Sequence, residues 1–520
     1  MWNRLFLVML VAMFQSVSTS YAEPGDEVLL SGPAYLRALS LDVRGHPPTF
    51  EEYGQLLDAS DSFDAEAVMD AWMNDDGVEE DKFADRIVRF HKNRFWNNNV
   101  GTGIGYYLWQ LKQDSSTGIW FAPRKSWLYG RGVETSCSNT PATFDAEANP
   151  VLINSQWGLR DEGYVMVDPY WDPGNPVKVC ALDAQDQYYA SNGTECFSDD
   201  GWSNARCGCG PNLSFCFYDY YDTGVRYITS SFDEDVNRRV AEMIRKDRPY
   251  TELLTDNRAW VNGPIVNHLK YKKDIWMFGA NFTNAPYDVE RLPDLEWTEI
   301  NEWREVELGP EQAGIFTSPA FLLRFMSNRA RANRFFNEFL CQPFQTPEGG
   351  LPVGSDSIPT LNLNQRDGCK YCHSLLEPSA ATWGRWVEGG VGYLDPERYP
   401  DQNSACEEDV FTRDCRYYVN ATTLEEYPFV GYLDAFLFLE ERHHENITLG
   451  PKLLVEQGIQ DGRLQQCVAR KAAEYWLDRE LEDDEEEWLH DLATRFENSN
   501  WDYKFLVKEI LKSSSYRRLP

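Results

Sequence analysis

The stretch "DGCKYCHSLLEP", residues 367–378, holds two cysteines three positions apart, with a histidine directly after the second. In a chain of 520 residues with 12 cysteines and 7 histidines, chance produces about 0.004 such motifs. A Cys-x-x-Cys-His motif attaches haem covalently: the two thiols add to the porphyrin vinyl groups, and the imidazole ligates the iron. We therefore expect one haem c, anchored by Cys369 and Cys372, with His373 as the proximal iron ligand.

Two other chemistries use closely spaced cysteines. A zinc site needs further ligands, and the nearest cysteines in the sequence are Cys341, Cys406 and Cys415. A thioredoxin-like dithiol follows a strand that leads into a helix, whereas the segment before the motif is rich in Pro, Gly and Asn. The pattern favours haem over both.

The sixth iron ligand decides between two classes of function. All nine methionines precede the motif, the last being Met326, so no methionine C-terminal to the motif can supply that ligand. The remaining candidates are an open site with water and the side chains of Met326, His443, His444, His490, His268 and His91. Two protein ligands make a closed electron carrier, whereas an open site binds oxygen, peroxide or another small ligand.

The N-terminus predicts export. Residues 1–22 contain one basic residue, Arg4, then an apolar run over residues 5–14 and a small-residue ending at Ala22, which is typical of a signal peptide. No later stretch is long and apolar enough to span a bilayer. We expect a periplasmic or secreted protein.

The net charge of −34 makes nucleic acid an unsuitable partner. It is compatible with a solvated acidic surface and with a patch that attracts a basic redox protein. Oligomeric state cannot be read from composition.

The ten cysteines outside the motif are an even number, which allows up to five disulfides in an oxidising compartment. Six of them lie in residues 137–216, where helical periodicity is absent and Gly, Pro, Asn and Asp are frequent. This region is predicted to be a loop-rich, disulfide-stapled insertion with a few short strands. The ten are Cys137, Cys180, Cys196, Cys207, Cys209, Cys216, Cys341, Cys406, Cys415 and Cys467.

Most of the rest has helical spacing, so the fold is predicted to be mainly α and multi-helical, with a cytochrome c-like haem module. Helices are expected around 81–96, in two pieces over 318–341, and at 462–479, 483–497 and 501–513. Thr49 with Glu52, and Ser231 with Glu234, have the spacing of capping boxes at helix starts. The predicted division is a signal peptide at 1–22, a helical region at 23–127, the Cys-rich insertion at 128–225, a helical region at 226–345, the haem module at 346–440 and a helical module at 441–520.

Four segments resemble the planctomycete-type cytochrome c proteins, large exported bacterial proteins built from modules of mostly unassigned function. They cover about half of the chain in the family's order. The resemblance implies an exported haem protein whose haem ligands carry over onto Cys369, Cys372 and His373. The segments are "LRALSLDVRGHPPTFEEYGQLL" (36–57), "IRKDRPYTELLTDNRAWVNG" (244–263), "GIFTSPAFLLRFMSNRARANRFFNEFLCQPF" (314–344) followed by "CKYCHSLLEPSAATWGRW" (369–386), and the helical stretch 467–518.

This chain departs from the family in two places. The cysteine-rich stretch 137–216 has no recognised counterpart, and "SAATWGRW" replaces the usual Phe-rich segment after the acid-Pro pair. Arg385, twelve residues after His373, is a candidate partner for a haem propionate, the alternative being an ordinary surface arginine.

The favoured function is electron transfer by a single-haem cytochrome, with no catalytic residues assigned. One alternative is a haem enzyme with an open distal site that acts on peroxide or oxygen. The other is a cell-surface polysaccharide-binding protein with an accessory haem, in which 18 Trp and 27 Tyr offer stacking surfaces.

Overall fold

A computed structural model describes most of the chain after residue 28. The predicted signal peptide, residues 1–22, lies outside the described residues. The described ranges are 29–58, 63–74, 82–98, 110–123, 135–154, 160–196, 198, 200–201, 204, 206–218, 224–273, 283–344, 363, 368–408, 414–420, 427–434 and 441–518.

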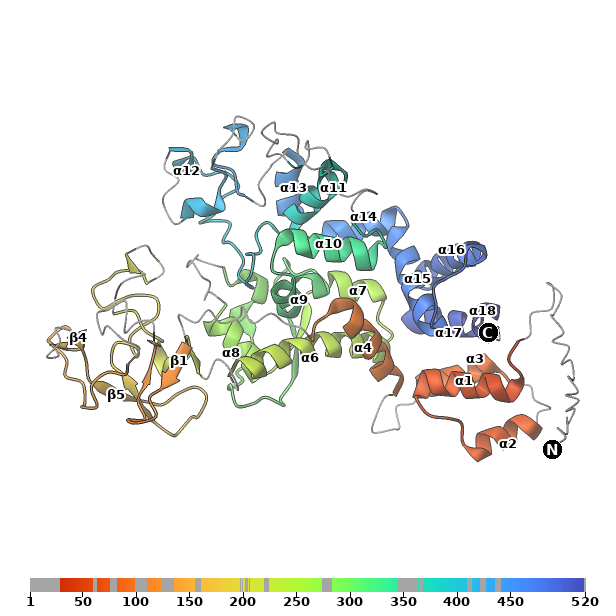
Figure 1. The fold of residues 1–520 in the computed structure, drawn as a ribbon, viewed down its shortest axis with the longest axis horizontal. Helices are drawn as coiled ribbons and strands as arrows, with labels where there is room; N and C mark the ends of the chain where they lie inside the picture. The colour runs from red at the N-terminus through yellow and green to blue at the C-terminus, as the bar shows by residue number, and fades with distance from the viewer. Residues whose placement is uncertain are drawn as a thin grey trace, which may run out of the picture.

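The fold is mainly α, as the helical periodicity predicts (Figure 1). Across the described ranges, no helix has the length and apolar character needed to cross a membrane. The helices are α1 (Gly32–Arg44), α2 (Phe50–Asp58), α3 (Ala65–Met73), α4 (Lys82–Phe95), α6 (Gly224–Arg245), α7 (Tyr250–Thr255), α8 (Gly263–Tyr271), α9 (Pro319–Arg324), α10 (Asn328–Phe339), α11 (Lys370–Ala380), α12 (Ala405–Glu408), α13 (Glu441–Leu449), α14 (Lys452–Gln460), α15 (Arg463–Leu477), α16 (Glu486–Asn498), α17 (Tyr503–Lys512) and α18 (Ser514–Arg517).

Polar side chains define several helix starts. Thr49 and Glu52 form the predicted capping box: each backbone N–H donates to the other's side chain, over 2.6 and 3.2 Å. The second predicted box is wrong, because α6 begins at Gly224 and Ser231 lies inside it. There the Ser231 hydroxyl donates to the Tyr227 carbonyl at 2.7 Å, a bond that a serine within a helix commonly makes.

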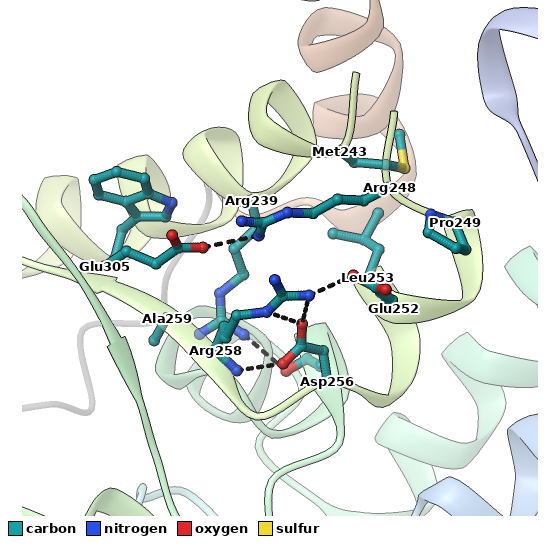
Figure 2. A pocket seen from close by; sticks show the side chains of 12 residues that line it. Arg239, Met243, Arg248, Pro249, Glu252, Leu253, Asp256, Arg258, Ala259 and Glu305 are labelled. Carbon is teal, nitrogen blue, oxygen red and sulfur yellow. Dashed lines mark hydrogen bonds and ion pairs between the residues drawn. The ribbon is translucent and has the colours of Figure 1, made fainter. Parts of the chain in front are cut away.

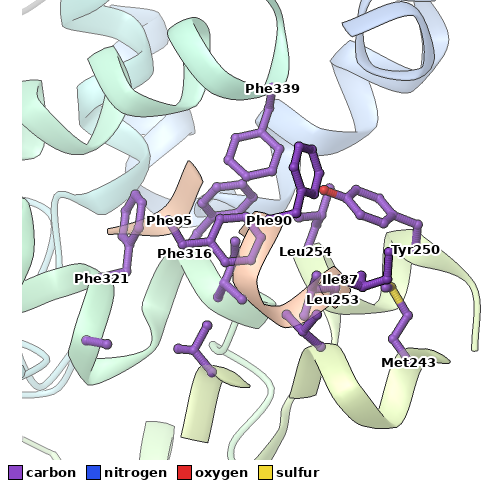
Figure 3. Close-up of a cluster of buried hydrophobic side chains, with 14 of the residues drawn as sticks. Ile87, Phe90, Phe95, Met243, Tyr250, Leu253, Leu254, Phe316, Phe321 and Phe339 are labelled. Carbon is purple, nitrogen blue, oxygen red and sulfur yellow. The ribbon is translucent and has the colours of Figure 1, made fainter. Parts of the chain in front are cut away.

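The main core lies where α4, α6, α7, α9 and α10 meet, and phenylalanines dominate it (Figure 3). Phe316, on the short helix η7 (Gly314–Thr317), packs edge-on against Phe339 of α10, with ring centroids 4.9 Å apart. Phe339 in turn stacks on Phe95 of α4 at 5.8 Å. Segments far apart in sequence therefore share one aromatic cluster, in which offset and edge-to-face ring contacts add to the hydrophobic effect.

The N-terminal and C-terminal helices lie together, with α3 packed against α17 (Figure 1). The Tyr35 hydroxyl on α1 donates to the Leu511 carbonyl on α17 at 2.9 Å, and Leu29 forms a β-bridge with Arg518. Lys508 of α17 forms an ion pair with Asp70 of α3 at 2.7 Å. The predicted C-terminal helices thus bury their apolar face against the N-terminal helices.

The Cys-rich insertion carries a small mixed sheet with strand order β5-β6-β2-β1-β7 (Figure 1). Strands β1 and β2 come from before residue 128, the predicted start of the insertion. Disulfides Cys137–Cys180, Cys196–Cys207 and Cys209–Cys216 staple it, as the cysteine crowding predicts. The strands are β1 (Gln110–Gln113), β2 (Trp120–Phe121), β3 (Ile153–Asn154), β4 (Arg160–Asp161), β5 (Tyr164–Val167), β6 (Val177–Cys180) and β7 (Phe217–Tyr218).

A buried lysine joins the insertion to the helical body. Lys272, just after α8, donates to the Ser214 carbonyl at 2.5 Å and to the side chain of Asn267. Its ammonium lies 4.1 Å from the centroid of the Tyr170 ring, close enough for a cation–π contact. Burial lowers the pKa of Lys272 well below its ordinary value.

One element within the predicted helical region 226–345 is not helical. Strands β8 (Arg258–Val261) and β9 (Arg304–Glu307) pair antiparallel, with Ala259 opposite Val306. Along β8 only Ala259 and Val261 are buried, so the alternation typical of a strand spans just four residues and gives a weak signal.

The segment that carries the haem motif is tied to the main core. Helix α11 packs against α10 and continues into the short helix η8 (Ala381–Trp383). The Trp383 indole N–H donates to the Phe316 carbonyl at 2.9 Å, and its ring stacks on Phe321. The motif helix therefore leads directly into the aromatic cluster.

The fully buried side chain of Arg331 connects the loops where the motif segment meets the aromatic cluster. The Arg331 guanidinium donates to the carbonyls of Leu322, Phe325, Trp386 and Val387 over 2.9 to 3.2 Å. Burial lowers the pKa of Arg331 to about 10, so it keeps its charge near neutral pH.

Replacing Arg331 with methionine should lower the free energy of unfolding by about 3 kcal/mol or more, because the carbonyls lose their buried donors. A urea titration followed by tryptophan fluorescence measures it. Arg291→Met is the control, since the Arg291 side chain is 82% exposed and its ion pair with Asp288, at 3.4 Å, is on the surface; a similar loss in both variants would contradict the role given to Arg331.

Candidate functional site

The Cys-x-x-Cys-His motif forms the start of α11. Gly368 has a φ of +82°, which glycine adopts without steric cost, and the chain then turns into the helix. Cys369 occupies the N-cap position, and its carbonyl accepts from the N–H groups of Cys372 at 3.1 Å and His373 at 3.0 Å. Residues three and four apart share a helix face, so both cysteines and the histidine lie on one side of the first turn.

The other ten cysteines all form disulfides, five in number, whereas Cys369 and Cys372 remain thiols. The sequence predicts this separation into a motif pair and ten disulfide cysteines, but it leaves the pairing open. Besides the three disulfides of the insertion, Cys341–Cys467 joins the end of α10 to α15, and Cys406–Cys415 closes a short loop after the motif.

His373 is held by a carboxylate one helical turn further on. Its Nδ1 hydrogen-bonds Oε1 of Glu377, whose side chain is fully buried. Arg329, in the first turn of α10, donates through Nε to both Glu377 oxygens, at 2.8 and 3.1 Å. With Nδ1 engaged as the donor, Nε2 is the nitrogen available to a metal, and the imidazole stays 21% exposed.

Neither Glu377 nor Arg329 was predicted from the sequence to have a role at the motif. The spacing of four between His373 and Glu377 is the signal that identifies the carboxylate, since residues i and i+4 are neighbours on a helix. Arg329 lies 48 residues before Glu377, and only the packing of α10 against α11 brings the two together.

These residues fit a covalently attached haem. The donor set contains two thiols for thioether bonds and one imidazole whose second nitrogen is fixed by a carboxylate, the arrangement that orients histidine toward a metal. Zinc fits less well. Within the described ranges, the one cluster of three metal-ligating side chains is Cys137, Glu162 and Cys180, and its two cysteines are disulfide-bonded.

The sixth-ligand candidates lie in different parts of the fold. His443 and His444 are in the first turn of α13, which packs against α11 and η8; their side chains fall outside the described residues. On the same helix, Asn446 donates to the Pro378 carbonyl of α11 at 2.8 Å. Met326 lies between α9 and α10, and its side chain is 45% exposed. Of these candidates, His443 and His444 belong to a helix in contact with the motif helix.

His91, His268 and His490 have structural surroundings of their own. His91 is buried among aromatic rings on α4 and its Nδ1 donates to the Ile87 carbonyl at 2.8 Å, in line with its expected place on a packed helix face. His268 is buried on α8 beside Phe232. His490 is exposed on α16 and contacts Gln466.

Arg385 is buried, so it is not an ordinary surface arginine. Its buried guanidinium forms an ion pair with Asp401 at 2.5 Å and donates to the Tyr399 carbonyl at 3.1 Å. It fixes the loop that follows η8, beside the small core that includes Cys406 and Cys415.

A pocket lies in the Asp-Arg-Pro-Tyr segment, between α6, α7, β8 and β9 (Figure 2). Three arginines line it, and each has a carboxylate partner: Arg239 with Asp235, Arg248 with Glu305, and Arg258 with both Asp256 and Glu252. Because each arginine is paired with a carboxylate, we interpret the charged side chains of this pocket as a structural ion-pair network. None of the sequence-predicted haem residues lines it.

Comparison with known proteins adds no further identification: no family model, no curated protein and no solved structure matches this chain. The interpretation of the motif therefore depends on its own chemistry and geometry.

The two buried histidines make stability depend on pH. Burial, reinforced by Arg94 near His91 and by Lys272 near His268, lowers each pKa from 6.5 to about 3. Each histidine is neutral in the folded state but protonates in the unfolded state below pH 6.5. Their contribution is therefore complete above pH 6.5 and is lost as the pH falls toward 3.

Lowering the pH from 7 to 5 should therefore reduce the free energy of unfolding by about 2 kcal/mol for each of the two histidines. In urea titrations at pH 7 and pH 5, the His91→Gln variant should lack the part of this reduction that His91 causes. The exposed His490→Gln should leave the loss unchanged. An equal pH dependence in His91→Gln and the parent protein would contradict this assignment.

Proposed function

We propose that this protein is an exported c-type cytochrome that carries one covalent haem and acts in electron transfer. One observation carries the proposal: two cysteine thiols and a histidine share the first turn of α11, and a buried carboxylate holds the histidine by Nδ1. Cys369 and Cys372 would form the thioether bonds. His373 would ligate the iron through Nε2.

Haem supplies one-electron redox chemistry when it is bound. The chain provides the attachment and the orientation. Because α11 packs against α10 and Trp383 leads into the aromatic core, the histidine stands on a rigid element.

The exposed surface of α11 gives further support. Tyr371 is 66% exposed and Leu375 52% exposed, on either side of Cys372 along the helix. These two side chains, four residues apart, share a face of the helix that is turned away from Cys369 and His373. A redox protein that docks on this helix, and not the porphyrin, would cover them.

Export is part of the proposal, and the five disulfides support it. Disulfides persist in oxidising compartments, which are also where c-type haem is attached. The net charge of −34 favours a basic redox partner.

The proposal is tested by producing the full chain with the cytochrome c maturation machinery. The pyridine haemochrome spectrum should be that of a thioether-linked haem, at one haem per chain. Cys369→Ala with Cys372→Ala should abolish the covalent haem. Cys406→Ser with Cys415→Ser removes another cysteine pair from the same part of the chain and should leave the haem attached.

A colourless protein with two titratable thiols would contradict the proposal. Oxidation of those thiols to a sixth disulfide would indicate a redox dithiol in place of haem.

The contact of α13 with α11 predicts where the sixth ligand comes from. His443→Ala or His444→Ala should convert a low-spin optical spectrum into a high-spin one, because losing a strong axial ligand weakens the ligand field at the iron. Met326→Leu should leave the spectrum unchanged.

The same spectra distinguish the second candidate function. A parent protein that is already high-spin, and whose ferrous form binds carbon monoxide readily, would have an open site and would be a haem enzyme.

A further inference from the structure

We propose that Glu377 is a positioning residue that lowers the reduction potential of the haem, with Arg329 limiting the effect. The inference rests on the proposed haem attachment and concerns the nitrogen of His373 that faces away from the iron. Glu377 accepts a hydrogen bond from Nδ1 of His373 and two from Arg329.

The chemistry follows from what the second nitrogen of an iron-bound imidazole contacts. A carboxylate acceptor draws the Nδ1 proton more strongly than a neutral carbonyl does, so the imidazole becomes a more basic ligand. A more basic ligand stabilises ferric iron, which carries one more positive charge than ferrous iron. The ferric form is therefore favoured and the reduction potential falls.

Burial makes the carboxylate effective. The Glu377 side chain is fully buried, and charges interact more strongly where water is excluded. A buried charge must also be paired, and Glu377 is paired with His373 and Arg329. Its negative charge is thus shared between the imidazole and one guanidinium.

Arg329 reaches the carboxylate from the other side. It belongs to the first turn of α10, where Asn328 donates its N–H to Glu388 at 2.8 Å and Ser327 caps the helix. The guanidinium lies on a fixed element and pulls electron density of the carboxylate away from His373. Arg329 and Glu377 should therefore move the potential in opposite directions.

This opposition provides the test. Glu377→Gln should keep the haem and raise the potential, because a neutral amide is a weaker acceptor. Arg329→Gln should lower the potential, because the carboxylate loses its guanidinium partner and draws the Nδ1 proton of His373 more strongly. The expected shift in each direction is at least tenfold in the ferric-to-ferrous ratio at a fixed ambient potential, or about 59 mV for one electron.

The control is Glu388→Gln, which removes a carboxylate near the same helix start without touching His373. Its potential should match that of the parent protein. Spectroelectrochemical titration gives the potentials, and the ferric electron paramagnetic resonance spectrum should change in Glu377→Gln and Arg329→Gln but not in the control.

Unchanged potentials in the two variants would overturn the inference, and so would shifts of the same sign, which indicate general disruption of the site. If Glu377→Gln retains no haem, Arg329→Gln carries the test alone: an unchanged or raised potential overturns the inference. A parent protein that never binds haem refutes the proposed function instead, so the two failures are distinguishable.

Discussion

The buried charge of Glu377 is the constraint on which the motif region depends. A carboxylate excluded from water must be paired, and the structure pairs it with a histidine on its own helix and an arginine on the preceding one, α10. That requirement fixes the ring of His373, the packing of α11 on α10 and the direction in which the second imidazole nitrogen is offered. The Cys-x-x-Cys-His motif alone identifies the three residues proposed to hold haem, and the carboxylate fixes the orientation of the histidine.

The rest of the fold holds this pair of helices in place. Arg331 donates hydrogen bonds to carbonyls in the loops beside α10 and after η8. Trp383, at the end of the motif segment, packs into the phenylalanine cluster of Figure 3. The Cys341–Cys467 disulfide then joins α10 to the helical tail, which packs on the N-terminal helices. A motif on one short helix is thereby connected to both ends of the described chain.

Long helices with regular apolar spacing were predictable from the sequence. The segments now assigned to α4, α10, α15 and α17 have that spacing, and their bounds agree with prediction to within a few residues. The start of α6 was not predictable, because Ser231 and Glu234 imitate a cap within a helix that begins seven residues earlier. The pairing of β8 with β9 was missed because the two short strands are far apart in sequence and tertiary packing, not a long alternating pattern, keeps them together.

The candidate site likewise has residues that the sequence predicts and contacts that it does not. Local spacing revealed Cys369, Cys372 and His373, whereas the Arg329 contact and the disulfide pairing depend on folding that brings distant residues together. The central claim is covalent haem at the motif, and peptide mass spectrometry of the matured protein tests it most directly. The account predicts that the proteolytic peptide containing residues 369–373 carries the mass of one haem; the same peptide found at its bare mass, as free thiols or as a disulfide, would contradict it.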